Sequence, residues 1–239
     1  MFGFMKKTSA VPAVVPAHIA FICDGNRRWA KMRGMPSMEG HREGAKSVDK
    51  TVEHLLALGV STMSFFVFST DNWGREKREV DFLINFVLTE MPKRKKMAME
   101  KNVRIKFIGR RNVLPPKIIK MCEKLEYETS ENTAGTICFA FDYSGTDEIV
   151  RAARAAIESG IAPDALDRET FETFLDSGEL PPIDLVVRTS GESRISDFML
   201  WKLAYAELSF VSDLWPSMNP KILDRVLADY GKRKRRFGK

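Results

Sequence analysis

Strand-length apolar runs alternate with segments of helical periodicity along almost the whole chain. Five such runs cover residues 19–23, 63–68, 103–108, 136–141 and 183–187, and a shorter one covers 208–210. Between them, apolar residues recur every three or four positions, as on one face of a helix. Apolar strands that alternate with helices are typical of a parallel sheet with helices on both faces. The sequence therefore predicts an α/β fold with a mostly parallel, six-stranded sheet.

The helical segments indicate one domain. Helices are expected at residues 43–58, 78–100, 116–130, 149–157, 164–175 and 198–205, and after Pro220. Pro92 lies inside the 78–100 segment and should kink or break it. Another helix is expected from Ala30, after the first strand. With no internal repeat, we expect a single domain over residues 18–239, preceded by a flexible tail over residues 1–17.

Composition limits the compartment and the partners. The 239 residues carry a formal net charge of +6, which permits an anionic partner such as a diphosphate, a nucleic acid or a lipid surface. The three cysteines, Cys23, Cys122 and Cys138, have no metal-ligand spacing, so free thiols in a reducing compartment are expected. The sequence shows no signal peptide or membrane-spanning stretch, and we predict a cytoplasmic location.

Several common catalytic motifs are absent. The sequence contains no G-x-x-x-x-G-K-[ST], no G-x-S-x-G, no G-x-G-x-x-G after the first strand, and no paired Cys/His set. Nucleotide-binding and serine-hydrolase functions therefore have no support from motifs.

Polar residues follow four of the predicted strands, at the point where each strand ends. The clusters begin at Asp24, Ser69, Asp142 and Arg188. The carboxyl ends of parallel strands meet at one edge of a sheet, and ligands of such proteins bind in the crevice there. Several arginines lie in these clusters, and guanidinium groups bind phosphate in a bidentate manner. The sequence therefore predicts a site for two multiply charged phosphate groups.

Asp24 is the first polar residue after the first strand. A carboxylate cannot hold a phosphate by itself, because both are negative, but a divalent cation or the neighbouring Arg27 and Arg28 would reconcile them. The alternative is an Asp-Gly turn that caps a helix. An isolated histidine such as His41 is more often a packed or surface residue than a catalytic one, and the alternative for any single arginine is a solvated surface residue.

In sequence order, several motifs of the chain resemble those of the cis-prenyltransferases. They are H-I-A-F-I-C-D-G-N-R-R-W-A-K from His18, G-H at Gly40, F-S-T-D-N-W-x-R from Phe68, R-T-S-G-E-x-R-I-S-x-F from Arg188, W-x-L-A-Y-A-E-L from Trp201, L-W-P from Leu214, and a terminal R-R-F-G. The resemblance extends from His18 to Gly238. The bacterial type member of this family is undecaprenyl diphosphate synthase, also called isoprenyl transferase.

The resemblance implies a Mg²⁺-dependent condensation of isopentenyl diphosphate with an allylic diphosphate. The expected primer is farnesyl diphosphate, and the expected product is undecaprenyl diphosphate for a cell-wall lipid carrier; a shorter or longer product is the alternative. It also implies an apolar tunnel, which would account for the stripe over residues 80–91 and for Phe65, Phe66, Phe82 and Phe86; a dimer face or a core face is the alternative for that stripe. A homodimer without a nucleic-acid partner is expected, and peripheral contact with the inner face of a membrane is compatible with product release.

The site residues implied by the resemblance follow from the motifs. Asp24 and Asn72 are expected to be catalytic, and Asp24 and Glu207 to hold Mg²⁺. Arg188, Arg194 and Ser196 match the isopentenyl diphosphate clamp. The other expected substrate-binding residues are Gly25, Asn26, Arg27, Arg28, Trp29, Arg33, His41, Ser69, Thr70, Asp71, Trp73 and Arg75.

Some positions depart from the family's usual pattern. Arg27 stands where many bacterial members have glycine, Ser37 where a basic residue is common, and Asp71 where glutamate is usual. The other departures are Asp142, Ser144 and Thr146, which replace the familiar N-Y-G-G-R, and Asp197, which replaces an asparagine. They concern the allylic substrate and the rate more than the reaction type.

Three rival interpretations predict different features. A phosphohydrolase with Asp24 as nucleophile would need a second aspartate two residues on, where the chain has Asn26. A binding module would use the basic end, residues 232–236, to contact RNA or anionic lipid. A catalytically silent subunit is disfavoured, because Asp24, Arg188, Arg194 and Glu207 are all present.

Overall fold

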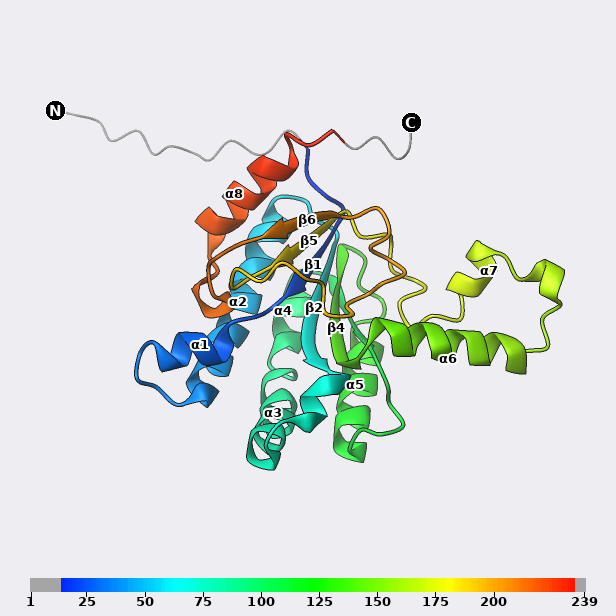
Figure 1. Cartoon of the computed structure of the whole chain (residues 1–239), viewed down its shortest axis with the longest axis horizontal. Helices are drawn as coiled ribbons and strands as arrows, with labels where there is room; N and C mark the ends of the chain where they lie inside the picture. Colours follow the sequence, from blue (N-terminus) through cyan, green and yellow to red (C-terminus); the bar gives the residue numbers. More distant parts are fainter. Residues whose placement is uncertain (1–13, 235–239) are drawn as a thin grey trace.

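The computed structural model describes residues 14–234, which contain one six-stranded sheet. The strands are β1 (His18–Ile22), β2 (Thr62–Ser69), β3 (Val103–Ile108), β4 (Gly135–Tyr143), β5 (Leu185–Arg188) and β6 (Glu207–Phe210). Their order across the sheet is β3-β4-β2-β1-β5-β6, and every neighbouring pair is parallel (Figure 1). The predicted fold class is confirmed.

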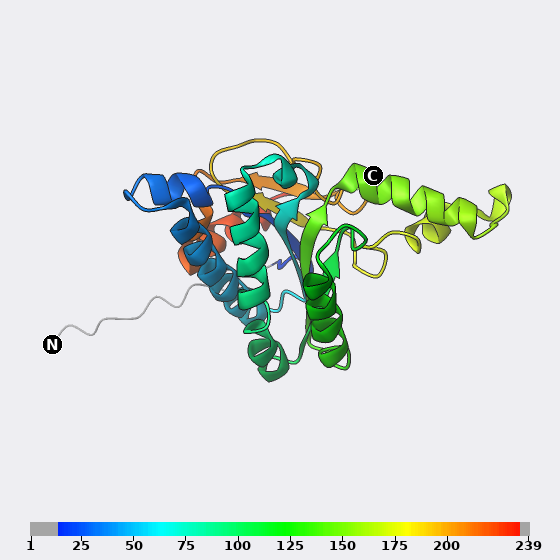
Figure 2. The same cartoon turned by 90° about the horizontal axis from the view of Figure 1, so that it is seen from below.

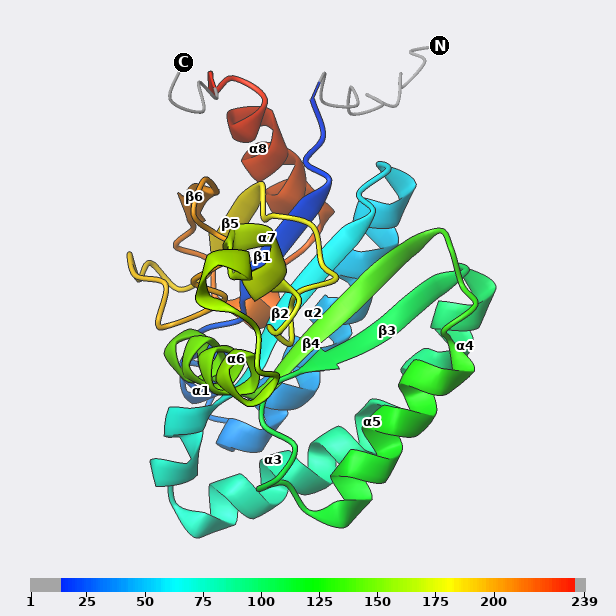
Figure 3. The same cartoon turned by 90° about the vertical axis from the view of Figure 1, so that its right-hand side faces the viewer.

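One face of the sheet carries the larger core and is covered by helices. These are α2 (Ser37–Ala57), α3 (Lys77–Glu90), α4 (Arg94–Glu100), α5 (Pro116–Glu128) and α8 (Pro220–Tyr230) (Figure 3). Successive strand residues point to opposite faces, so Ile19 and Phe21 join this core while Ala20 and Ile22 join a smaller one behind the sheet. The predicted 78–100 helix is broken into α3 and α4 around Pro92, as expected.

The opposite face is covered mainly by chain without regular secondary structure. Phe198 and Met199 are fully buried in the smaller core, but residues 198–205 form turns, and the helix predicted there is wrong. Ser196, Asp197 and Met199 have positive φ angles of 50°, 62° and 43°. This left-handed conformation cannot continue a right-handed helix.

Helix α6 (Gly145–Glu158) and the short α7 (Arg168–Glu172) project beyond the sheet (Figures 1 and 2). The alanine-rich α6 packs on α7. The helix predicted over residues 164–175 is divided into a 3-10 turn, η2 (Pro163–Ala165), and α7. The division arises because Asp167 caps α7, and its side chain accepts the Thr170 N–H at 2.8 Å.

The end of the predicted flexible tail is attached to the domain. Pro16 is buried, and the Ala17 carbonyl accepts the Thr62 N–H at 2.9 Å. The Ala17 N–H in turn donates to Asp184 at 2.8 Å. Residues 1–13 of the predicted tail, and residues 235–239 of the basic C-terminal segment, lie outside the described residues. Within residues 14–234, no helix is long and apolar enough to cross a membrane.

Candidate active site

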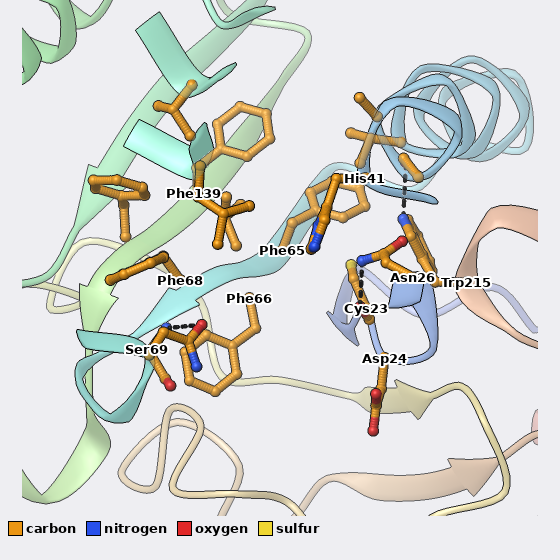
Figure 4. Close-up of a pocket in the computed structure, with 18 of the residues that line it drawn as sticks. Cys23, Asp24, Asn26, His41, Phe65, Phe66, Phe68, Ser69, Phe139 and Trp215 are labelled. Carbon is orange, nitrogen blue, oxygen red and sulfur yellow. Dashed lines mark hydrogen bonds between the residues drawn. The ribbon is translucent and has the colours of Figure 1, made fainter. Parts of the chain in front are cut away.

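The ends of several strands open onto one cavity of about 370 Å³. Polar side chains line its part near the strand ends, namely Asp24, Asn26, His41, Ser69, Asp71, Asn72, Arg75, Arg188 and Ser196. Apolar side chains from β2, β4, α2 and α3 line the rest, among them Phe65, Phe86, Val87, Met91 and Phe139. Figure 4 shows Asp24 and Ser69 apart from the rings of Phe65 and Phe139. The cavity therefore joins a charged region to an apolar one.

Asp24 lies two residues after the end of β1 and is held by two arginines. Its Oδ2 accepts a hydrogen bond from Arg188 Nη2 at 3.0 Å, and its Oδ1 lies 3.2 Å from Arg28 Nη2. Partial burial acts to raise the pKa of Asp24, but hydrogen bonds from Arg188 and Ser190 and the charges of Arg28 and Arg188 outweigh it. The net pKa is lowered, so Asp24 is a carboxylate at neutral pH.

Arg188 is the central cation of the site. It is only 4% exposed at the end of β5, and besides Asp24 it binds the Ser196 hydroxyl at 2.7 Å and the Arg194 carbonyl at 2.6 Å through Nη1. The resemblance predicted that Arg188 and Ser196 act together, and both line the cavity. The Arg194 side chain does not line it, since it is 60% exposed and pairs with Glu192.

Gly25 forms the turn between β1 and α1 (Asn26–Lys31). Its φ is +106°, and a Cβ there would lie 2.8 Å from Leu214 Cδ2, so only glycine fits without strain. The helix begins at Asn26, four residues before the predicted start at Ala30. Asn26 Nδ2 donates to the Cys23 carbonyl at 3.3 Å, while its buried Oδ1 has no partner within the described part of the chain (Figure 4).

His41 contributes a neutral imidazole to the cavity. Burial lowers its pKa to about 4, assisted by Arg75 and Arg27 and opposed by Glu79. Its Nε2 is buried and unpartnered among residues 14–234. A buried polar atom without a partner is costly, so an atom at the cavity wall such as this one is available to a ligand.

The turn η1 (Thr70–Gly74) brings the residues after β2 to the site. Ser69 and Asn72 form a reciprocal capping box at its start, with the Ser69 N–H donating to Asn72 Oδ1 at 3.3 Å. Both residues line the cavity with Arg75. Sequence reasoning missed Glu79, which binds Arg75 at 2.8 Å and Arg27 at 3.2 Å. Its one signal was its position one helical turn after Arg75.

Several predicted site residues lie outside the cavity wall. Thr70 and Trp73 line a separate surface depression with Asp71, Arg110 and Val113. Trp73 Nε1 donates to the fully buried Asp142 at 2.7 Å instead of facing the cavity. Trp29 and Arg33 stack on each other, with the guanidinium carbon 4.0 Å from the ring centre. None of these four side chains lines the cavity, so the structure gives no sign of direct contact between them and a substrate bound there.

Glu207 is at the wrong edge of the sheet to share a metal ion with Asp24 in one chain. It begins β6 and pairs with Leu185, which pairs with Ile19, five residues before Asp24. At about 3.3 Å per residue this separates the two by about 16 Å along the strands. The Glu207 carboxylate is instead bound by Arg233 at 2.9 Å. Within one chain, the structure therefore separates the two residues that were expected to hold Mg²⁺ together.

The remaining donor set still fits Mg²⁺. No group of three or more His, Cys, Asp or Glu side chains with metal-binding geometry occurs within residues 14–234. Mg²⁺ is commonly bound through one or two carboxylates, water and substrate phosphates, without a complete protein cage. Asp24 supplies one ionised, partly exposed carboxylate at the cavity. The site fits a cation that enters with a phosphorylated substrate.

Comparisons with known proteins agree over nearly the whole chain. A family profile described as "Putative undecaprenyl diphosphate synthase" matches residues 22–238. Isoprenyl transferase from Aquifex aeolicus is 40% identical over 225 residues, which cover 94% of this chain and 96% of the relative. The protein of the same name from Caulobacter vibrioides is 43% identical, with 92% of this chain and 87% of the relative covered.

Two solved structures share the fold. Lavandulyl diphosphate synthase from Lavandula x intermedia, in complex with dimethylallyl diphosphate, superposes with a TM-score of 0.87 at 32% identity, covering 96% of this chain and 99% of that one. A probable undecaprenyl diphosphate synthase from Campylobacter jejuni gives a TM-score of 0.80 at 30% identity, with 95% and 100% covered. This chain is a prenyltransferase and belongs to the undecaprenyl diphosphate synthase family of isoprenyl transferases.

Proposed function

We propose that this prenyltransferase extends an allylic diphosphate with isoprene units from isopentenyl diphosphate, in a Mg²⁺-dependent reaction that forms cis double bonds. The single observation that carries the proposal is the cavity, which joins Asp24 and Arg188 to an apolar interior. A prenyl diphosphate has the same two parts. We propose farnesyl diphosphate as the primer and undecaprenyl diphosphate as the product.

The charged end of the cavity is suited to ionisation of the allylic substrate. As the allylic carbon–oxygen bond breaks, negative charge grows on the departing diphosphate, and fixed cations stabilise that charge most in the transition state. Arg28 already faces Asp24, and Arg75 lines the same cavity. Asp24 would hold Mg²⁺, which supplies further positive charge to the diphosphate oxygens when bound. Ser69 and Asn72 are positioned to hydrogen-bond the reacting diphosphates.

The apolar part of the cavity is suited to the growing tail. The whole cavity, charged and apolar parts together, has a volume of about 370 Å³, which falls within the roughly 300–1,000 Å³ of small-molecule sites and is adequate for a short primer. Of the predicted tunnel residues, Phe65, Phe66 and Phe86 line the cavity, whereas Phe82 does not and stacks on Phe86.

The proposal extends to assembly and location. Leu208 and Phe210 on the edge strand β6 are 37% and 38% exposed, and apolar side chains on an unpaired edge favour contact with a second subunit. We therefore propose a homodimer, to be tested by sedimentation equilibrium. A cytoplasmic enzyme at the inner face of a membrane, without a nucleic-acid partner, completes the proposal.

The test is product formation. Purified protein is incubated with Mg²⁺, farnesyl diphosphate and labelled isopentenyl diphosphate, and the products are sized by chromatography. A ladder that ends near eleven isoprene units supports the full proposal, and a shorter ladder retains the reaction but rejects the undecaprenyl product. Absence of condensation with farnesyl, geranyl and geranylgeranyl diphosphate rejects the proposed function. Chelation of Mg²⁺ before substrate addition tests the metal requirement.

A further inference from the structure

Three of the positions that depart from the family pattern contact one another. The Asp197 carboxylate accepts hydrogen bonds from the Thr146 N–H at 3.0 Å, from the Thr146 hydroxyl at 2.9 Å, and from the Ser144 hydroxyl. Ser144 and Thr146 lie at the start of α6, whereas Asp197 is about fifty residues further along the chain. These substitutions therefore form one hydrogen-bonded unit, which we call the Asp197 latch.

The backbone reinforces the Asp197 latch. The Gly145 N–H donates to the Asp197 carbonyl at 2.7 Å, and a Cβ on Gly145 would lie 2.8 Å from the same oxygen. Only glycine permits this approach. The carboxylate also lies at the N-terminal end of a 14-residue helix, where backbone N–H groups and the helix dipole favour a negative charge.

The Asp197 latch stabilises the strained backbone at residues 196 and 197. Ser196 and Asp197 both have positive φ angles, 50° and 62°. Non-glycine residues keep such conformations only when surrounding contacts compensate for the strain. For Asp197 those contacts are the four hydrogen bonds to residues 144–146.

The strained segment carries the groups that position Arg188. Ser196 Oγ and the Arg194 carbonyl both accept hydrogen bonds from Arg188 Nη1, at 2.7 and 2.6 Å. Arg188 Nη2 then reaches Asp24 at 3.0 Å. A continuous set of contacts thus runs from the start of α6, through Asp197 and Ser196, to the two charged groups at the centre of the site.

We infer that Asp197 is a positioning residue, which acts with Ser144 and Thr146 to fix the Ser196 hydroxyl and the Arg188 guanidinium for binding the diphosphate of isopentenyl diphosphate. This inference rests on the proposed function and adds residues outside the cavity wall to it. It also gives the departures at positions 144, 146 and 197 one shared physical role, since each supplies a donor or acceptor to the other two.

The experiment compares three variants. Asp197→Ala removes the acceptors, so the KM for isopentenyl diphosphate should rise about tenfold, the equivalent of one or two charge-assisted hydrogen bonds. The KM for the allylic diphosphate should change by less than about twofold, because the Arg28 and Arg75 side of the site is untouched. Asp197→Asn keeps an oxygen for the Thr146 N–H and an NH₂ group for the hydroxyls, and should restore the KM to within about threefold of the wild type.

Asp167→Ala is the matched control. Asp167 also caps a helix and also accepts both the N–H and the hydroxyl of a threonine, Thr170, at 2.8 and 2.7 Å, but it lies on α7 away from the cavity. Its KM values should equal those of the wild type. Equal shifts of both substrates' KM values in Asp197→Ala, or no shift at all, would overturn the inference.

Binding of inorganic diphosphate separates this inference from the proposed function. If the wild type fails to condense any allylic diphosphate, the proposed function is rejected, but calorimetry of inorganic diphosphate still reports on Arg188. About tenfold weaker binding to Asp197→Ala, with unchanged binding to Asp167→Ala, supports the positioning role. Equal binding by Asp197→Ala and wild type contradicts it. Thermal unfolding of each variant confirms that folded protein is compared.

Discussion

Arg188 and Asp24 connect the ends of two neighbouring strands through a 3.0 Å ion pair. Arg188 ends β5 in register with Ile22, and Asp24 lies two residues beyond Ile22. The pair places one fixed cation and one fixed anion at the charged end of the cavity. It also keeps Asp24 ionised, because the pKa of this carboxyl is below its usual range. A cation that binds Asp24 must therefore share it with Arg188.

Asp24→Ala should abolish most of the turnover while isopentenyl diphosphate still binds. Loss of one charge-stabilising group costs roughly 2–4 kcal/mol of barrier, or roughly 10²–10³-fold in kcat. Arg188 and Arg28 lose an anionic partner and become more available to the diphosphate. Single-turnover kinetics and calorimetry with isopentenyl diphosphate check the two parts. Retained turnover would remove Asp24 from its assigned role.

Arg188→Lys should raise the KM for isopentenyl diphosphate by roughly tenfold or more, although the charge is kept. A lysine ammonium is a point charge and cannot reproduce the planar fork with which Arg188 contacts Asp24, Ser196 and the Arg194 carbonyl. Arg225→Lys is the control, since Arg225 makes one exposed contact with Asp213 at 2.8 Å. Initial rates over a range of isopentenyl diphosphate concentrations give the result. Equal KM values for both variants would contradict the role of the fork.

Most of the fold could be predicted from the sequence, because buried parallel strands are continuous apolar runs. All six predicted strands occur, and Pro92 breaks its helix as expected. The error at residues 198–205 has a local cause: the periodicity is helical, but Asp197 and Met199 adopt left-handed conformations that tertiary contacts impose. Periodicity does not report such contacts.

Part of the site could be predicted from the sequence, because the end of a strand tells which edge of the sheet a residue reaches. Asp24 follows its strand, and Arg188 and Ser69 end theirs, so all three reach the same edge of the sheet. Glu207 is the first residue of β6, and in a parallel sheet the first residues of the strands lie at the opposite edge from the last ones. This signal was available in the sequence. The contact between Asp197 and Ser144 was not, because it depends on an irregular segment that no pattern describes.

Asp142→Ala should destabilise the protein by about 1.5–3 kcal/mol, the usual contribution of hydrogen bonds to a charged group, because its partner Arg110 is 27% exposed and stays hydrated when the carboxylate is removed. Asp142 is fully buried, and it binds Arg110 through both oxygens at 2.9 and 3.1 Å. The change also removes the acceptor for Trp73 Nε1, which tethers η1. Urea unfolding measures the loss. Trp73→Phe removes only the hydrogen bond to Asp142 and should cost about 1 kcal/mol of stability. A larger loss of stability for Trp73→Phe than for Asp142→Ala would contradict this prediction.

Met91→Ala should shift the product distribution toward longer chains. Met91 lies just after α3, lines the apolar part of the cavity and is almost fully buried. Removing its thioether extends the space open to the tail, at a stability cost of about 2–5 kcal/mol. Chromatography of labelled products reports the chain lengths. Met99→Ala, at an exposed position on α4 outside the cavity, should leave them unchanged.

The unfolding free energy should fall as the pH falls from about 6.5 to about 4, in part because of His18. Its ring is fully buried on β1, where Nδ1 donates to the Pro181 carbonyl at 2.8 Å, so Nε2 accepts from the Ser64 hydroxyl at 2.8 Å. Burial lowers its pKa, and the charge of Lys202 adds to this, while the Pro181 hydrogen bond and Asp184 oppose it; the result is about 4 instead of 6.5.

Proton binding to His18 sets the direction in which the unfolding free energy changes with pH. Between pH 6.5 and 4 the unfolded chain protonates His18 and the folded chain does not, so protons favour unfolding. The stabilisation is complete above pH 6.5 and is lost as the pH falls toward 4, by up to about 3 kcal/mol for a shift of this size. Urea denaturation at several pH values measures it for the wild type and for His18→Gln. Part of the pH dependence should remain in the variant, because burial also lowers the pKa of His41 to about 4. If the unfolding free energy of His18→Gln declines with falling pH as steeply as that of the wild type, His18 has the same protonation in the folded and unfolded states, and the prediction is wrong.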